Sequence, residues 1–286
     1  MPAVERLLVL GAGHTGLATL RRAAAHGLRT AAFVRREEVA ASLRALGHDV
    51  TIAPSFATAA SAIASASDER TLVAILFPPD GATDEALAAA FIARPKERRP
   101  FITYVSSTGV YGDRRGVIDD TTPVSDTPSG AATKRLEAER IWSALDATIL
   151  RCPAIYGPDR GLHVRVAEGK HRIPGDGSGY VSRIHVDDLA AFVLASPRAP
   201  GNVFVVGDAE PAPHRDVVAF VCATHGLPMP PFAPLDEVHE SLRGDRRIDP
   251  SRALATLGVT LEHPSYRTGM ATLTRRGRDD EIEAQR

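Results

Sequence analysis

A glycine-rich segment near the start of the chain has the residue types and spacing of a phosphate-binding turn. It lies between the apolar run 7–10 and an Ala- and Leu-rich stretch at 15–26. Where a strand turns into a helix through such glycines, the backbone can approach a pyrophosphate closely and the first helical amides face the anion. The alternative is a βα turn that binds no ligand. We predict a dinucleotide site, and its expected contacts are Gly11, Gly13, His14, Thr15 and Gly16.

Two arginines follow the second predicted strand, 29–34, where a dinucleotide fold distinguishes between its cofactors. A carboxylate at this point accepts the ribose 2′-hydroxyl of NAD, whereas a guanidinium pairs with the 2′-phosphate of NADP. Arg35 and Arg36 therefore favour NADP over NAD. The alternative is a solvated helix start, because Arg36 and the two glutamates after it also form an ordinary charged first turn.

Four later segments resemble the motifs of the extended short-chain dehydrogenases/reductases, the NAD-dependent epimerase/dehydratase-like family. They read FITYVSSTGVYG at 101–112, KRLEAE at 134–139, RCPAIYGP at 151–158 and SRIHVDDLA at 182–190. The resemblance extends from about residue 7 to residue 270. It implies NAD(P) binding and oxidoreductase or epimerase-like activity without naming a substrate. It also places Phe77 and Pro78 beside the cofactor ribose, where proline offers shape but no amide donor.

In that family a serine, a tyrosine and a lysine act together, with the tyrosine four residues before the lysine. By position, the resemblance assigns the serine to Ser107 and the lysine to Lys134, and the tyrosine position is Gly130. Acid–base help of this kind is typically worth roughly 10²- to 10⁴-fold, and glycine carries no proton. The resemblance therefore implies an atypical member without the active-site tyrosine, which uses another group, a substrate that needs none, or no chemistry.

Three residues are candidates for the catalytic centre, and two of them have a plainer alternative. Tyr111 either reaches the substrate pocket with its hydroxyl or packs on its own turn. Ser107 is expected to orient a carbonyl oxygen, because a hydroxyl with an ordinary pKa is a poor base. Lys134 either holds the cofactor ribose or belongs to the solvent-facing charges of helix 134–140.

The histidines and cysteines predict no metal site. Ten histidines form no HExxH motif or Cys/His cluster, and two cysteines are too few for a disulfide framework. Cys152 is expected to be a small buried hydrophobe. His185 and Asp187 could form a catalytic pair, but we favour Asp187 as the N-cap of a helix over 188–195.

Two departures from the family motifs bear on the substrate. Relatives that use nucleotide sugars have an asparagine where this chain has Ala154, and a diphosphate-binding arginine where it has Val181. Arg160, Arg165 or Arg183 could supply an anion site elsewhere. We favour an oxidoreductase or epimerase-like enzyme acting on a small hydroxyl or carbonyl compound. The alternatives are a catalytically silent NADP-binding sensor or scaffold, and a nucleotide-sugar epimerase or dehydratase.

The elements that would position these residues alternate between strand and helix, as a parallel sheet requires. Strands are predicted near 7–10, 29–34, 49–53, 71–77, 101–105, 147–151 and 202–206. We therefore predict an α/β protein with a Rossmann-like doubly wound sheet and a small C-terminal substrate lobe. The predicted division assigns 1–156 and 184–207 to the Rossmann domain, 157–183 and 208–273 to the lobe, and 274–286 to a disordered tail.

Composition limits the partners of the chain. The 286 residues carry a formal net charge of −1, so no basic excess points to nucleic acid, and no apolar run approaches the length of a membrane span. The N-terminus shows no pattern of a signal peptide, which predicts a cytoplasmic protein. We expect a small-molecule substrate, no nucleic-acid or membrane partner, and leave open a homodimer formed through helices that flank the sheet.

Overall fold

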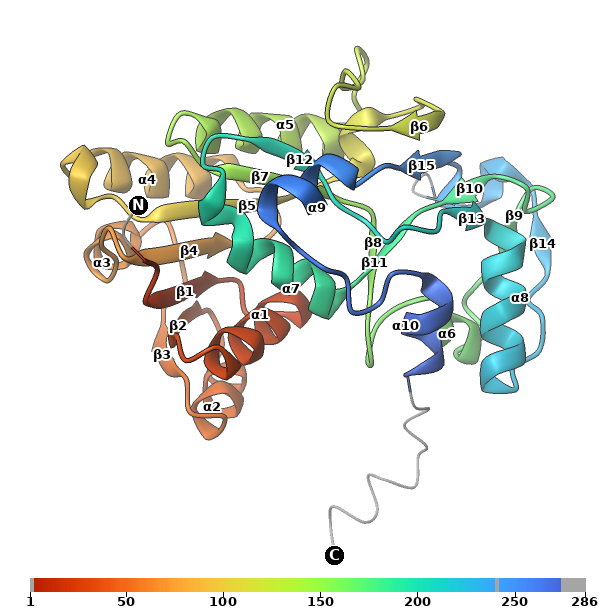
Figure 1. Ribbon diagram of the computed structural model, residues 1–286, viewed down its shortest axis with the longest axis horizontal. Coiled ribbons are helices and arrows are strands. Elements are labelled where there is room, and N and C mark those ends of the chain that lie inside the picture. The colour runs from red at the N-terminus through yellow and green to blue at the C-terminus, as the bar shows by residue number, and fades with distance from the viewer. Residues whose placement is uncertain (1–2, 240–241, 274–286) are drawn as a thin grey trace, which may run out of the picture.

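The computed structural model describes residues 3–239 and 242–273, and its centre is a seven-stranded sheet (Figure 1). The strands are β1 (Arg6–Leu10), β2 (Arg29–Val34), β3 (Asp49–Ile52), β4 (Thr71–Ile75), β5 (Phe101–Ser107), β7 (Thr148–Cys152) and β12 (Val203–Val205). Their order is β12-β7-β5-β4-β1-β2-β3, and all neighbours are parallel. The chain thus starts in the middle of the sheet and winds outwards in both directions. This order confirms the predicted Rossmann-like fold.

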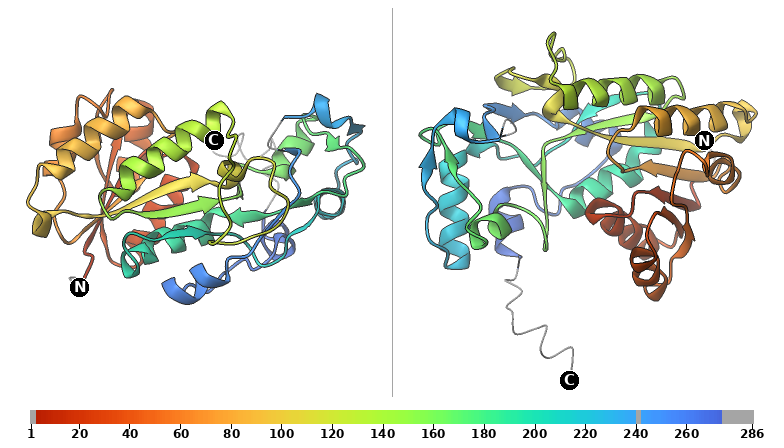
Figure 2. Two further views of the ribbon diagram at one scale, coloured as in Figure 1. Left: turned by 90° about the horizontal axis from the view of Figure 1, so that it is seen from above. Right: turned by 180° about the vertical axis from the view of Figure 1, so that it is seen from behind.

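Helices cover both faces of the sheet, because its strands are apolar on both sides (Figure 2). Within β1, Leu7 and Val9 enter one core and Leu8 and Leu10 the other. The first core is closed by α1 (His14–Ala25), α2 (Glu37–Ala45), α7 (Val186–Ala195) and α9 (Ser251–Leu257). The second is closed by α3 (Ala60–Ser65), α4 (Gly81–Ile92) and α5 (Gly130–Ser143).

Most of the smaller elements gather beyond the carboxyl ends of the central strands (Figures 1 and 2). Four short strand pairs lie there: β8 (Ala154–Tyr156) with β11 (Arg183–His185), β9 (Ile173–Pro174) with β14 (Phe232–Ala233), β10 (Tyr180–Val181) with β13 (Ala212–Pro213), and β6 (Gly116–Ile118) with β15 (Arg246–Ile248). A third core joins α6 (Leu162–Ala167), α8 (His214–His225) and α10 (Tyr266–Ala271). The division of the chain into a Rossmann domain and a lobe stays a prediction.

The start of α7 differs from the prediction. The helix begins at Val186, and its N-cap is His185, whose Nδ1 accepts a hydrogen bond from the backbone N–H of Asp187 at 3.3 Å. Asp187 lies in the first turn instead, where the helix dipole favours its negative charge. The prediction of Asp187 as N-cap was therefore wrong, because a histidine takes the role that sequence patterns assign to short polar side chains.

The remaining described elements are single turns of 3₁₀ helix. They are η1 (Lys96–Arg98), η2 (Thr108–Tyr111), η3 (Ser196–Arg198) and η4 (Leu235–Glu237). Over 3–239 and 242–273, no helix has both the length and the apolar character that crossing a membrane needs. The predicted tail, 274–286, lies outside the described residues.

Candidate functional site

The three glycines of the β1–α1 turn have three different surroundings. Gly11 has a φ of 94°, and a Cβ built on it would lie 2.8 Å from the backbone nitrogen of Phe77. A Cβ on Gly16 would lie 2.7 Å from the carbonyl oxygen of Gly11. A Cβ on Gly13, the N-cap of α1, would meet nothing within 4 Å. Gly11 and Gly16 therefore allow close packing of the turn, whereas Gly13 faces open space in front of the helix N-terminus.

A cavity of about 840 Å³ opens beside this turn, between α1 and α2. Three arginines, Arg21, Arg36 and Arg160, are among the residues that line it. The other lining residues are Ala12, Gly13, His14, Leu17, Glu38, Val39, Ser42, Leu43, Leu46 and Asp159. The structure thus brings Arg36 to the glycine turn, whereas Arg35 is exposed and is not part of the lining. Sequence reasoning had no signal for Arg21, and it considered Arg160 only as an anion site elsewhere.

His14 and Thr15 occupy the first positions of α1. His14 is half-buried, and its Nε2 is buried without a hydrogen-bond partner. A Cβ on Gly157 would lie 2.9 Å from this nitrogen, so the ring packs against the loop after β8. Burial, and next the charge of Arg160, lower the pKa of His14, which keeps the imidazole neutral at the mouth of the turn.

The residues directly after β4 pack against the glycine turn. Phe77 is buried, its ring contacts the ring of Phe56 with centroids 5.4 Å apart, and its backbone touches Gly11. Pro78 is exposed. Phe77 therefore packs against the glycine turn, and Pro78 is exposed, so that its ring is accessible for van der Waals contact with a ligand.

Ser107 and Lys134 lie on neighbouring elements at the carboxyl edge of the sheet. Ser107 ends β5, is half-buried, and its Oγ accepts a hydrogen bond from the N–H of Gly109 at 3.0 Å. Its hydroxyl proton can therefore be donated outwards. Lys134 is exposed on α5, one turn after Gly130, which starts that helix and where an added Cβ would meet nothing within 4 Å. Among the described residues, Lys134 forms no ion pair.

Tyr111 belongs to a buried network. Its side chain is fully buried, and its hydroxyl accepts a hydrogen bond from Nη1 of Arg151 at 3.1 Å. Arg151 also holds Glu139 of α5, with Nη2 and Oε2 2.7 Å apart, and Glu139 accepts a hydrogen bond from Ser106. Burial raises the pKa of Tyr111. These contacts favour the packing alternative for Tyr111 over a hydroxyl that reaches the substrate.

The same network corrects the description of helix 134–140 as a row of solvent-facing charges. Glu139 is buried, and Arg135 donates hydrogen bonds to the hydroxyl of Tyr104 and the carbonyl of Val105. Only part of the charged helix is therefore solvated, with Lys134 on the exposed side. The sequence could not reveal this, because the partners of Glu139 come from distant strands.

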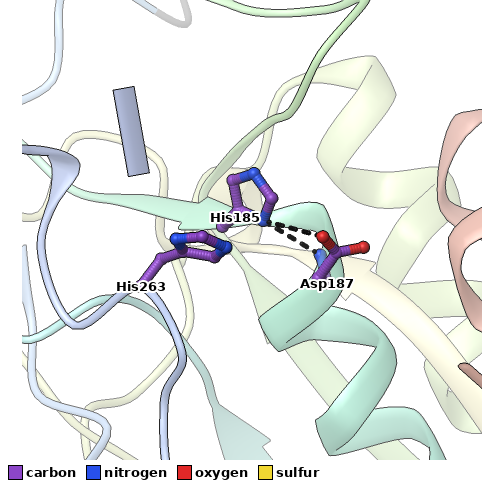
Figure 3. A group of neighbouring side chains, drawn as sticks. All are labelled: His185, Asp187 and His263. Atoms are coloured by element: carbon purple, nitrogen blue, oxygen red, sulfur yellow. Dashed lines mark hydrogen bonds and ion pairs between the residues drawn. The ribbon is translucent and has the colours of Figure 1, made fainter. Parts of the chain in front are cut away.

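A group of three ionisable side chains lies at the start of α7 (Figure 3). The rings of His185 and His263 are tilted, with centroids 3.8 Å apart, and Oδ2 of Asp187 is 3.5 Å from Nδ1 of His185. Burial, followed by the neighbouring His263 and His14, lowers the pKa of His185 to about 4. Sequence reasoning considered His185 and Asp187 together but missed His263, which arrives from the segment before α10.

Comparisons with known proteins agree with this geometry. A family model described as NAD(P)H-binding matches residues 11–199. A 3-diazoavenalumate denitrifying reductase from a Streptomyces species is 32% identical over 177 residues, which are 54% of this chain and 58% of that protein. The chain thus matches less than two thirds of that relative's length.

Two solved structures cover nearly the whole chain. A conserved protein of unknown function from Silicibacter pomeroyi is 30% identical, with a TM-score of 0.76 over 94% of this chain and 98% of that one. A putative NAD-dependent epimerase/dehydratase from Methylobacillus flagellatus is 25% identical, with a TM-score of 0.73 over 95% and 98%. Both likenesses include the sheet and the elements beyond its carboxyl edge.

Proposed function

The chain belongs to the NAD(P)H-binding family, and on that premise we propose that it is an NADPH-dependent oxidoreductase acting on a small hydroxyl or carbonyl compound. The observation that carries the proposal is the arginine-lined cavity beside the glycine turn. Gly13 leaves room there for a pyrophosphate, and the N-terminus of α1 offers free amides and a positive dipole end. The reductase among the relatives supports reduction over epimerisation.

Arg36 is the residue on which the choice of NADPH rests. It lies two residues after the end of β2, occupies the N-cap position of α2 and lines the cavity. A guanidinium binds a phosphate through two parallel hydrogen bonds, each worth roughly 1.5–3 kcal/mol when charged. We propose that Arg36 contacts the 2′-phosphate, while Arg35, outside the lining, contributes longer-range charge.

The residues at the carboxyl edge fit the reduction of a polarised acceptor. NADPH, when bound, supplies a hydride to the substrate. The hydroxyl of Ser107 accepts a hydrogen bond from Gly109 and keeps its proton, which it donates to the substrate oxygen. Lys134 holds the ribose hydroxyls. Since Gly130 provides no phenol, the favoured substrate is one whose product takes its proton from water or needs none.

A second cavity favours a substrate that carries a negative group. It measures about 190 Å³ and begins at Gly112, directly after the turn that follows Ser107. Its lining includes Arg114, Arg115, Arg243 and Arg246, against two aspartates, Asp113 and Asp245. We propose a small carbonyl compound with a carboxylate or phosphate group, which these arginines would hold.

The test is titration of the purified protein with NADPH and NADH, followed by nicotinamide fluorescence. We expect Arg36→Ala to weaken NADPH binding by about 10- to 100-fold and to leave NADH binding nearly unchanged. Gly13→Asp is expected to abolish both, because a carboxylate would meet the pyrophosphate. The matched control is Arg29→Ala, which removes an exposed arginine from the opposite end of β2.

The outcomes separate the alternatives. If Arg36→Ala bound NADPH as tightly as the unchanged protein does, or if the unchanged protein did not prefer NADPH to NADH, the NADPH assignment would be contradicted. Tight NADPH binding with no turnover of any acidic or neutral carbonyl substrate would favour the silent sensor or scaffold, which the glycine at position 130 also allows. Turnover of a UDP- or dTDP-sugar would support the nucleotide-sugar alternative despite Ala154 and Val181.

A further inference from the structure

We propose that His185, Asp187 and His263 form a binding site for a divalent transition-metal ion, and that Zn²⁺ suits their chemistry. One nitrogen of each imidazole and one carboxylate oxygen lie within 4.8 Å of one another. Two imidazoles with one carboxylate are a known zinc ligand set that leaves a coordination position open for water. The site goes beyond the proposed reductase function and does not depend on it.

The orientation of His185 supports a cation between these side chains (Figure 3). Its Nδ1 accepts a hydrogen bond from the backbone N–H of Asp187, so the lone pair of the neutral ring lies on Nδ1. The carboxylate Oδ2 of Asp187 is 3.5 Å from the same nitrogen. Two hydrogen-bond acceptors, Nδ1 of His185 and Oδ2 of Asp187, therefore face each other and repel. A metal ion bound between them would be coordinated by both atoms. The hydrogen bond, at 3.3 Å, is long enough to be replaced easily.

The backbone around His263 is already fixed in place. The carboxylate of Asp188 accepts hydrogen bonds from the N–H groups of Glu262 and His263, at 2.7 and 3.1 Å. Glu262 also pairs with Arg22 of α1 at 2.6 Å. The segment that carries His263 is thus tied to α7 and α1 before any ion binds, which lowers the entropic cost of forming the site.

Burial lets the site close around an ion. His185 is buried, whereas Asp187 and His263 are partly exposed, so an ion can enter from solvent. Zinc–nitrogen distances of about 2.0–2.1 Å bring ligating atoms to about 3.3 Å from one another. The required contraction is at most about 1.5 Å, which rotation of the two partly exposed side chains can supply.

The position of the site suggests what the ion would do. A Cβ on Gly157 would touch both Val186 and His14, so the start of α7 meets the first residue of the cofactor helix there. A metal ion bound by His263 and by the residues at the start of α7 would hold the segment before α10 beside the glycine turn. We expect its effect to be structural, because neither imidazole lies among the residues that line the two described cavities.

The test uses the full chain without an affinity tag, treated with EDTA and then dialysed. We titrate Co²⁺ and record its visible ligand-field bands, then displace it with Zn²⁺. We expect one equivalent of Co²⁺ to bind and Zn²⁺ to remove the bands. Asp187→Asn and His263→Gln should each weaken Co²⁺ binding by at least about tenfold.

The matched control is His225→Gln. The ring of His225 stacks on that of His163, and this pair belongs to no described group of three metal-ligating side chains. Circular dichroism of the metal-free variants checks that each is folded, and Asp187→Asn changes only a partly exposed side chain. Absence of Co²⁺ binding, or equal binding by all variants, would overturn the proposal. NADPH titration of the same samples reports the proposed function separately.

Discussion

At the scale of single residues, the tyrosine position implied by the family motifs offers a gain-of-function test. Gly130 starts α5 in open space, so a tyrosine there collides with nothing within 4 Å of its Cβ. Its phenol would lie one turn from the ammonium of Lys134, which lowers the phenol pKa. We expect Gly130→Tyr to raise the turnover of a carbonyl substrate by about 10²-fold in an NADPH-oxidation assay. An equal gain in Gly130→Phe would point to packing instead of proton transfer.

Tyr111 permits the opposite test, because its hydroxyl accepts a hydrogen bond from the partly buried guanidinium of Arg151. Removing it in Tyr111→Phe leaves one nitrogen of Arg151 without its partner, which costs about 1–3 kcal/mol of unfolding free energy. We expect urea denaturation to show this loss while the NADPH affinity stays unchanged. Ser107→Ala is the comparison, since it should reduce turnover and leave stability nearly as it was. A large fall in turnover at full stability for Tyr111→Phe would restore its catalytic role.

At the scale of elements, the glycine turn separates packing from ligand binding. In Gly16→Ala, the new methyl group would lie 2.7 Å from the carbonyl oxygen of Gly11, so α1 must move away from β1. We expect a loss of about 1–3 kcal/mol in unfolding free energy, measured by urea denaturation without cofactor. Gly13→Ala meets no protein atom within 4 Å and should leave stability nearly unchanged while weakening NADPH binding. The same loss of stability in both variants would contradict this division of roles.

The elements themselves were predictable, and several contacts between them were not. Apolar runs and punctuating glycines predicted all seven central strands. Six of them are largely buried, and such strands leave a continuous apolar run, whereas β3 is mostly exposed. The partners of Glu139 are Ser106 and Arg151, which lie on other elements. The sequence of the helix alone therefore predicted a solvent-exposed charge at this position. His185 as a helix cap and His263 as its neighbour are likewise products of tertiary packing. The strands were therefore visible in the sequence, whereas the buried polar networks were not, and the individual cofactor contacts stay a prediction.

At the scale of the whole molecule, parallel strands bring the ends of β1, β2, β4 and β5 to one edge. Segments that are distant in sequence therefore supply the glycine turn, Arg36, Phe77 and Ser107 at the same side of the sheet. The elements beyond that edge form their own apolar core around α6, α8 and α10. That core also buries polar groups, and these make the stability of the molecule depend on pH.

Two histidines near that core, His171 and His214, predict loss of stability in acid. Both are buried, their Nε2 atoms are 2.9 Å apart, and burial, followed by nearby arginines, lowers the pKa of His171 to about 4 and of His214 to about 3. In the unfolded chain both return to about 6.5, so the folded state binds fewer protons below that pH. The contribution of the two neutral histidines to the free energy of unfolding is therefore complete above pH 6.5. It is lost as the pH falls from 6.5 towards the folded pKa values of about 4 and about 3, by up to about 1.4 kcal/mol per group and pH unit.

Urea denaturation between pH 7.5 and 5 measures this dependence. His214→Gln keeps a polar side chain at the position but removes one titrating group, so we expect a shallower fall in unfolding free energy towards pH 5. His26→Gln is the matched control, because His26 is exposed at the end of α1. The two variants should differ in slope even if His214→Gln is less stable at every pH, since a packing defect shifts the whole curve and leaves its slope unchanged. Identical slopes in His214→Gln, His26→Gln and the unchanged chain would show that the acid sensitivity arises elsewhere in the molecule.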